Sequence, residues 1–242
     1  MKPFEGKYAV ITGGGSGISK ETGHVLAERG AAGIVLADMN MESAAVAARE
    51  ISAETGSHCI PFKMDVSNPA DIEALFAFAG EKFGAVHILV NGAGICPYVA
   101  IDQVDAAAWD ETMNINLRGS YLCAREAFKF MRPQKYGKVV NIASLAARIG
   151  GIASGINYTA SKGGIVSMTY ALAKIGMPFN INSNGVAPGV IATPLTQGQD
   201  YPPGTIIGQP RDIATVIAFL ASDDAKHING CTIDVNGGTY MH

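Results

Sequence analysis

Short runs rich in valine and isoleucine alternate along the whole chain with amphipathic stretches of helical period. The runs are almost continuously apolar, as is typical of strands buried on both faces of a parallel sheet. Strands that alternate with helices form right-handed βαβ units and build a doubly wound, Rossmann-like sheet. The sequence therefore predicts an α/β fold, a parallel seven-stranded sheet with helices on both faces. The expected strands are Tyr8–Thr12, Ile34–Ala37, Cys59–Lys63, Ile88–Asn91, Lys138–Ile142, Ile181–Val186 and Thr232–Val235.

The amphipathic stretches between these runs predict helices at Gly17–Arg29, Met41–Thr55, Pro69–Phe83, Ala106–Met131, Tyr158–Ile175 and Pro210–Ala221. No long linker, repeat or shift of composition divides the chain, so residues 1–242 are expected to form a single domain. The stretch 194–210 contains Gly and Pro and predicts a loop. A loop of this length in a compact α/β domain is more often a lid or binding loop than filler.

The composition excludes several classes of protein. Apolar residues make up 48% and charged residues 16%, so most of the chain is not disordered. The formal net charge of −3 argues against nucleic-acid binding, and no apolar run approaches the length of a membrane span. The four cysteines are scattered and the five histidines form no pair at ligand spacing, so we expect no disulfides and no metal. A short polar N-terminus leaves no room for a signal peptide, and a cytoplasmic protein is predicted.

A glycine-rich turn, Thr12–Ser19, connects the first predicted strand to the first predicted helix. Glycines let the backbone approach a diphosphate closely, while the free N–H groups and the dipole of the helix attract its charge. The alternative is a flexible turn without a ligand, but its place at the first βα turn favours the binding site.

Acidic residues follow the second and third predicted strands. Asp38 can accept hydrogen bonds from the ribose hydroxyls of an adenosine and would repel a 2′-phosphate, or it can cap the next helix together with Asn40. Asp65 and Val66 can lie near the adenine, although Asp65 can equally be a turn residue.

Four further side chains can handle a proton. Tyr158 and Lys162 are four residues apart and share one face of a helix, where an ammonium group would favour the phenolate and lower the pKa of the tyrosine. Ser144 follows the fifth strand, at the edge that lines the ligand crevice, although it can also be a capping serine. Asn116 lies within an apolar helix, where asparagine is unfavourable, or bonds its own backbone.

With these motifs in order along essentially the whole chain, the sequence resembles the short-chain dehydrogenase/reductase family. Thr12–Ser19 matches its T-G-x-x-x-G-x-G motif, and 91–94 (Asn-Gly-Ala-Gly) is similar to its N-N-A-G. Asn116, Ser144, Tyr158 and Lys162 match its Asn, Ser and Y-x-x-x-K positions. Further matches are the Pro188–Gly189 turn, Thr193, and 235–238 in place of V-D-G-G.

The resemblance implies that Tyr158 is the catalytic acid/base and that Ser144 positions the substrate oxygen. Lys162 would lower the pKa of Tyr158 and bind the nicotinamide ribose, and Asn116 would hold a water in a proton relay. A homotetramer or a dimer, built on the two long helices, is also implied. The implied cofactor-binding residues are Gly13, Ser16, Gly17, Ile18, Asp38, Asp65, Val66, Asn91, Ala93, Gly94, Tyr158, Lys162, Pro188, Gly189, Ile191 and Thr193.

The chain departs from the family pattern at several positions. Ser19 replaces the last glycine of the first motif, and Gly92 replaces the second asparagine of N-N-A-G. Asn182 stands where an arginine is common. Ser144 and Tyr158 are one residue further apart than usual, which makes Ser154 a rival for the serine role. The 194–210 loop is shorter than the usual substrate lid.

The predicted function is an NAD-dependent oxidoreductase that interconverts a secondary alcohol and a ketone, on an uncharged and hydrophobic small molecule. One alternative is an NADP-dependent 3-oxoacyl or carbonyl reductase, which Asp38 and the absence of Lys or Arg within Gly13–Gly17 disfavour. Another is a nucleotide-sensing protein that kept the fold and lost the chemistry, because a fold alone does not establish function.

Overall fold

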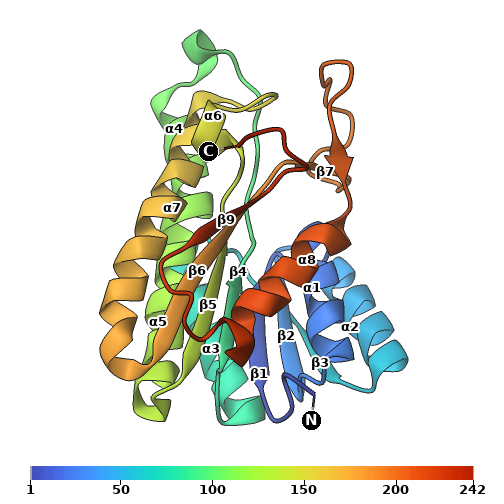
Figure 1. Ribbon diagram of the computed structural model, residues 1–242, viewed down its shortest axis with the longest axis vertical. Coiled ribbons are helices and arrows are strands. Elements are labelled where there is room, and N and C mark those ends of the chain that lie inside the picture. Colours follow the sequence, from blue (N-terminus) through green and yellow to red (C-terminus); the bar gives the residue numbers. More distant parts are fainter. Residues whose placement is uncertain (1, 242) are drawn as a thin grey trace.

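The computed structural model describes residues 2–241 and contains the predicted parallel sheet (Figure 1). Its strands lie in the order β3-β2-β1-β4-β5-β6-β9, and all neighbouring pairs are parallel. The strand order reverses between β1 and β4, and in such sheets a ligand crevice lies at the carboxyl ends of the strands at this point. The strands are β1 (Tyr8–Thr12), β2 (Gly33–Asp38), β3 (His58–Lys63), β4 (Ile88–Asn91), β5 (Gly137–Ile142), β6 (Ile181–Pro188) and β9 (Thr232–Val235).

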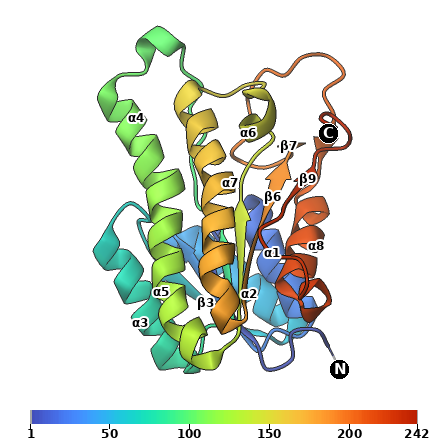
Figure 2. The same ribbon diagram turned by 60° about the vertical axis from the view of Figure 1, so that its left-hand side comes forward.

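Helices cover both faces of the sheet, as the sequence predicts, and Figure 2 shows α5 and α7 side by side on one of them. Two hydrophobic clusters lie between the layers. One joins the sheet to α1, α2 and α8, and the other joins it to α3, α5 and α7. The main helices are α1 (Gly17–Glu28), α2 (Met41–Thr55), α3 (Pro69–Phe83), α4 (Ala106–Met113), α5 (Gly119–Gln134), α7 (Ile156–Gly176) and α8 (Pro210–Ala221).

The predicted helix Ala106–Met131 is not one regular helix. A π-helical segment, Asn114–Arg118, separates α4 from α5. Such single-turn bulges are frequent at functional sites. The interruption is explained by contacts with distant parts of the chain. The buried Asn116 side chain bonds both backbone groups of Ile95 and the hydroxyl of Ser161. A regular helix through this region would place Asn116 differently.

Three short elements near the crevice were not predicted. The turn after β5 forms α6 (Ala146–Ile149), and β7 (Val190–Ile191) pairs with β8 (Ile207–Gly208) in a separate two-stranded sheet. The 194–210 stretch is therefore not a loop throughout: its last part forms β8 and the start of α8. A two-residue strand or a single helical turn carries too little periodicity to be recognised in a sequence.

Candidate active site

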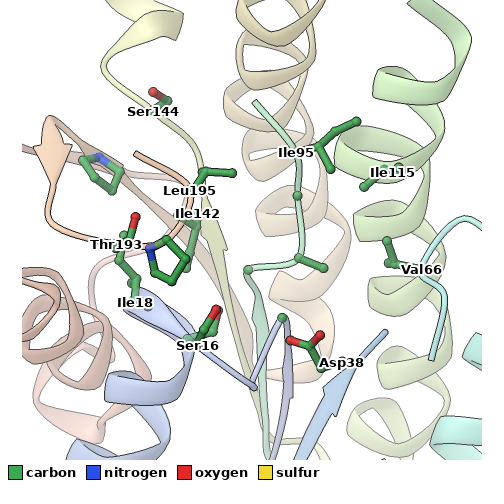
Figure 3. Close-up of a pocket in the computed structure, with 18 of the residues that line it drawn as sticks. Ser16, Ile18, Asp38, Val66, Ile95, Ile115, Ile142, Ser144, Thr193 and Leu195 are labelled. Atoms are coloured by element: carbon green, nitrogen blue, oxygen red, sulfur yellow. The ribbon is translucent and has the colours of Figure 1, made fainter. Parts of the chain in front are cut away.

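A cavity of about 410 Å³ opens at the carboxyl ends of the strands (Figure 3). This volume lies in the ordinary range for a small-molecule or cofactor site. Asp38, after β2, and Ser144, after β5, lie at opposite ends of it. All predicted cofactor-binding residues except Asn91 line this cavity, together with Ser144.

The glycine loop forms the floor of the cavity at the start of α1. Gly13 and Gly17 have φ of +68° and +55°, in the left-handed region that favours glycine. A Cβ at Gly13 would lie 3.0 Å from the backbone of Ala93, and one at Gly17 would lie 3.2 Å from Thr193 Cγ2. The loop therefore packs against both walls of the cavity with no room for side chains.

The N-terminus of α1 is prepared for an anion. Ser16 occupies the cap position, but its side chain makes no capping hydrogen bond, and the first turn contains no acidic residue. The first N–H groups of the helix thus remain free, and the helix dipole adds positive potential. A diphosphate fits this end of the helix.

Asp38 holds the glycine loop and also borders the cavity. Its Oδ2 accepts the Gly15 N–H at 2.9 Å, and its Oδ1 accepts the Asn40 N–H at 2.9 Å. The cap of α2 is Asn40, whose side chain accepts the Ser43 N–H, so capping by Asp38 itself is not observed. The carboxylate is therefore fixed beside the loop and does not cap α2.

Asp65 is a turn residue that also borders the cavity. Its Oδ1 accepts hydrogen bonds from the N–H and the hydroxyl of Ser67, so it shapes the turn before α3. Asp65 and Val66 also line the cavity. They face it from the same half as Asp38.

Tyr158, Lys162 and Ser144 meet at the other half of the cavity. Tyr158 is 8% exposed, and Lys162 Nζ lies 5.6 Å from the centroid of its ring. The Ser144 hydroxyl accepts the Ala146 N–H at 3.1 Å in the turn before α6, whose N-cap is Leu145, and it also forms a hydrogen bond with Tyr158. The structure thus brings together the three residues on which a proton transfer would depend.

Burial dominates the electrostatics of this group. It raises the pKa of Tyr158 well above its usual value, while the hydrogen bond with Ser144 lowers it. Burial also lowers the pKa of Lys162 to about 8. Lys162 Nζ donates to the carbonyl oxygen of Ile142 at 2.7 Å. A lowering of the Tyr158 pKa by Lys162 stays a prediction.

The lowered pKa of Lys162 predicts a pH-dependent stability. Between pH 8 and about 10.5 the unfolded chain binds the lysine proton and the folded protein does not, so stability rises with pH across this window. Relative to Lys162→Met, the wild-type free energy of unfolding is expected to gain about 3 kcal/mol from pH 7 to pH 10.5. Urea unfolding of both proteins at each pH measures this; a constant difference would contradict it.

Asn116 and Asn91 do not line the cavity. Asn116 bonds Ile95 and Ser161 behind it, while its backbone carbonyl accepts the Ser120 hydroxyl at 2.8 Å. Asn91 is 2% exposed and donates to Asn141 Oδ1 and to the carbonyl oxygen of Ser120. Asn91 thus ties β4 to β5 and α5, and Asn116 ties the π-helical segment to the loop after β4 and to α7.

Several lining residues were not predicted. Most are apolar side chains at strand ends, in the following loops or in the π-helical segment, which carry no chemical signal in a sequence: Met39, Met64, Ile115 and Ile142. Ser19 also lines the cavity, where only its departure from the glycine motif could have drawn attention to it.

A smaller cavity of about 70 Å³ adjoins the first and shares Ser144 and Tyr158 with it. Cys96, Gln199 and Tyr201 line its outer part. Ser154, the rival serine, lines only this cavity, and its buried hydroxyl has no hydrogen-bond partner within residues 2–241. A second molecule placed here would border Tyr158 and Ser144.

Two further classes of site are not found in the described part of the chain. No three His, Cys, Asp or Glu residues gather there in a geometry for a metal ion. None of its helices is both long enough and apolar enough to cross a membrane.

Known proteins share this arrangement. The family described as short chain dehydrogenase matches residues 7–202. The chain is 34% identical to a 3-oxoacyl acyl-carrier-protein reductase of Vibrio cholerae, over 98% of this chain and 99% of that one. It is 35% identical to a cis-4-hydroxycyclohexanecarboxylate dehydrogenase of Sinomonas cyclohexanicum, over 97% of each. The structure of levodione reductase superposes with a TM-score of 0.89 at 32% identity, covering 98% of this chain and all of that one.

The chain therefore belongs to the short-chain dehydrogenase/reductase family, as the motifs predicted. It is an oxidoreductase whose family binds a nicotinamide cofactor and acts on hydroxyl or ketone groups.

Proposed function

We propose that the protein is an NAD(H)-dependent oxidoreductase that interconverts a secondary alcohol and a ketone, with Tyr158 as the acid/base. One observation carries this proposal: Tyr158, Ser144 and Lys162 line the same cavity as the glycine loop and Asp38. A single dinucleotide could therefore occupy the loop at one end and reach the proton-handling residues at the other.

The residues present fit a nicotinamide dinucleotide. The glycine loop and the free N-terminus of α1 would hold its diphosphate, and Asp38 would accept hydrogen bonds from the adenosine ribose. When bound, the nicotinamide supplies the hydride donor or acceptor, while the protein supplies position and electrostatics.

Tyr158 would move the proton at the substrate oxygen, giving it to a ketone or taking it from an alcohol. Its raised pKa keeps the phenol protonated at neutral pH, the form that ketone reduction needs. Ser144, which is hydrogen-bonded to Tyr158, would hold the same oxygen, and Lys162 would bind the nicotinamide ribose. Asn116 would hold a water in a proton relay that reaches Lys162.

The smaller cavity supports an uncharged substrate. Within residues 2–241, no Lys, Arg, Asp or Glu lines it, and its walls are apolar except for Ser144, Ser154, Thr196, Cys96, Gln199 and the two tyrosines. A phosphorylated or carboxylated group would find no charged partner there, and burying an unpaired charge is costly. An uncharged, mainly hydrophobic alcohol or ketone fits best.

The alternative is an NADP-dependent 3-oxoacyl reductase, which the Vibrio cholerae relative favours by its name. Secondary alcohols and β-keto thioesters, each assayed with NAD(H) and NADP(H) by absorbance of the reduced nicotinamide, distinguish the two. The main proposal expects turnover of alcohols or ketones with NAD(H). Exclusive turnover of 3-oxoacyl thioesters with NADPH would support the alternative. Binding of a dinucleotide without turnover would support a nucleotide-sensing protein that lost the chemistry.

We also propose a homotetramer or a dimer. Large side chains are exposed on α5 and α7, among them Tyr121, Tyr170 and Ile175, which are each about half exposed. Light scattering of the purified protein measures the mass.

A cytoplasmic location and a single domain over residues 1–242 remain predictions.

The segment 195–206 is expected to act as a lid. Its side-chain hydrogen bonds include local ones, such as that of Tyr201 to Gln199, and Leu195 and Ile206 are about half exposed. Hydrogen exchange should therefore be fast in the free protein and slower with cofactor and substrate bound. The flanking strand β6 serves as the internal control, and equal protection of 195–206 in both states would contradict a lid.

A further inference from the structure

Ser19 replaces the last glycine of the first family motif, and its hydroxyl has no hydrogen-bond partner among the residues that the structure describes. The residue lies in the first turn of α1, is 4% exposed and lines the large cavity. No protein group between residues 2 and 241 shares a hydrogen bond with its side chain. Buried hydroxyls normally have partners, so this one is available to a ligand in the cavity.

Gly92 replaces the second asparagine of the N-N-A-G motif, and the two departures are linked in space. A Cβ built at Gly92 would overlap Ser19 Oγ and lie 3.0 Å from the carbonyl oxygen of Thr12. The φ of Gly92 is outside the left-handed region, so the residue is glycine for space and not for conformation. The Ser19 side chain occupies the room that a side chain at 92 would take.

The position of Ser19 indicates which part of a dinucleotide it meets. Gly92 follows β4, and a Cβ built on it would lie 3.0 Å from Ile142 Cδ1 at the end of β5, whereas Asp38 ends β2 on the other side of β1. Ser19 therefore lies on the half of the glycine loop that faces Lys162 and Tyr158. The adenosine end lies toward Asp38.

We propose that Ser19 Oγ donates a hydrogen bond to the phosphate that is joined to the nicotinamide ribose, and that Gly92 is required to let it do so. This inference rests on the proposed function, because it assumes a dinucleotide in the cavity. The free N–H groups of α1 and the Ser19 hydroxyl would then converge on one anionic group.

Two fragments of the cofactor test the position. ADP-ribose carries both phosphates, whereas AMP carries only the adenosine-side phosphate. Calorimetric titration of Ser19→Ala should show a dissociation constant about tenfold higher for ADP-ribose, the loss expected for a hydrogen bond to a charged group, and an unchanged one for AMP. Ser167→Ala, an exposed serine on α7, is the matched control and should bind both fragments as the wild type does.

Gly92→Ala tests the link between the two positions. Its methyl group would displace Ser19 Oγ, so we expect the same tenfold loss for ADP-ribose. In a Ser19→Gly background the same change should cost clearly less than in the wild type, because the overlap with Ser19 Oγ is gone and only the 3.0 Å approaches to Ile142 and to the Thr12 carbonyl oxygen remain.

Three results would overturn the inference. They are unchanged ADP-ribose binding by Ser19→Ala, equal losses for both fragments, or an equal effect of Gly92→Ala in both backgrounds. If the wild type binds neither ADP-ribose nor AMP, the proposed function fails as well. Intact wild-type binding with an inert Ser19 refutes this inference alone.

Discussion

A Tyr158→Phe variant is expected to lose about a thousandfold in kcat, while its dissociation constant for the dinucleotide changes by less than about threefold. The phenylalanine ring keeps the walls of both cavities, which Tyr158 lines, and removes only the hydroxyl. That hydroxyl is needed at the substrate oxygen in the chemical step, so its loss affects the transition state and not the cofactor complex. Steady-state kinetics and fluorescence titration of the reduced cofactor measure the two quantities.

Two further variants make this result specific. Lys162→Ala should lower kcat and also weaken cofactor binding, because Lys162 would contact the ribose as well as support Tyr158. Tyr121→Phe removes a phenol from the exposed surface of α5, where Tyr121 is 49% exposed, and should leave kcat unchanged. If Tyr158→Phe kept most of the wild-type kcat with a true substrate, Tyr158 would not be the acid/base.

The strands and most helices could be predicted because each carries its own periodic signal. The run at 137–142 is buried at every position, and its apolar residues reveal it without any tertiary information. Helix α8 begins at Pro210 and buries one face, a pattern that is visible in the sequence alone. Such local signals agree with the fold wherever packing does not override them.

The π-helical segment at Asn116 could not be predicted in this way. Its cause is a set of hydrogen bonds to Ile95, 21 residues away, and to Ser161, 45 residues away. The sequence marks Asn116 only as an unfavourable helical residue. Its partners become known only when α4, α5 and α7 are placed together.

The same limit applies to Asn91 and to the two departures from the family motifs, Ser19 and Gly92. Family motifs place Asn91 among the cofactor-binding residues, but its side chain is directed to Asn141 and Ser120 beneath the cavity. Ser19 and Gly92 are 73 residues apart, and in the sequence each is only a mismatch with a family motif. Only the overlap between a side chain at 92 and Ser19 Oγ shows that they compensate each other.

Cofactor choice is the second large expected effect, and it depends on Asp38. The carboxylate lines the adenosine half of the cavity and is held by the N–H groups of Gly15 and Asn40. With NADP it would face a phosphate of up to two negative charges. Like charges at contact distance cost on the order of 1 kcal/mol in water and several at a partly buried site.

No cation offsets this repulsion. Within residues 2–241, Lys162 is the single lysine or arginine that lines the cavity, and it lies at the other end. Lys20, close to the loop in sequence, is bound to Glu50 at 2.6 Å. We therefore expect NAD to be preferred over NADP by roughly a hundredfold in kcat/KM, which corresponds to about 2.7 kcal/mol.

Asp38→Ala should reduce this preference in two ways. It should weaken the binding of NAD, and it should remove the repulsion of the phosphate of NADP. It also removes the acceptor of the Gly15 N–H, so the KM for NAD should rise further than the loss of ribose contacts alone would cause. Asn40→Ala is the matched control: it deletes the cap of α2, costs about 1 kcal/mol of stability and leaves the preference intact. Initial rates with both cofactors at one substrate concentration series give the ratio for each variant. If the wild type uses NADP as well as NAD, Asp38 serves only to hold the loop, and the protein is not selective for NAD.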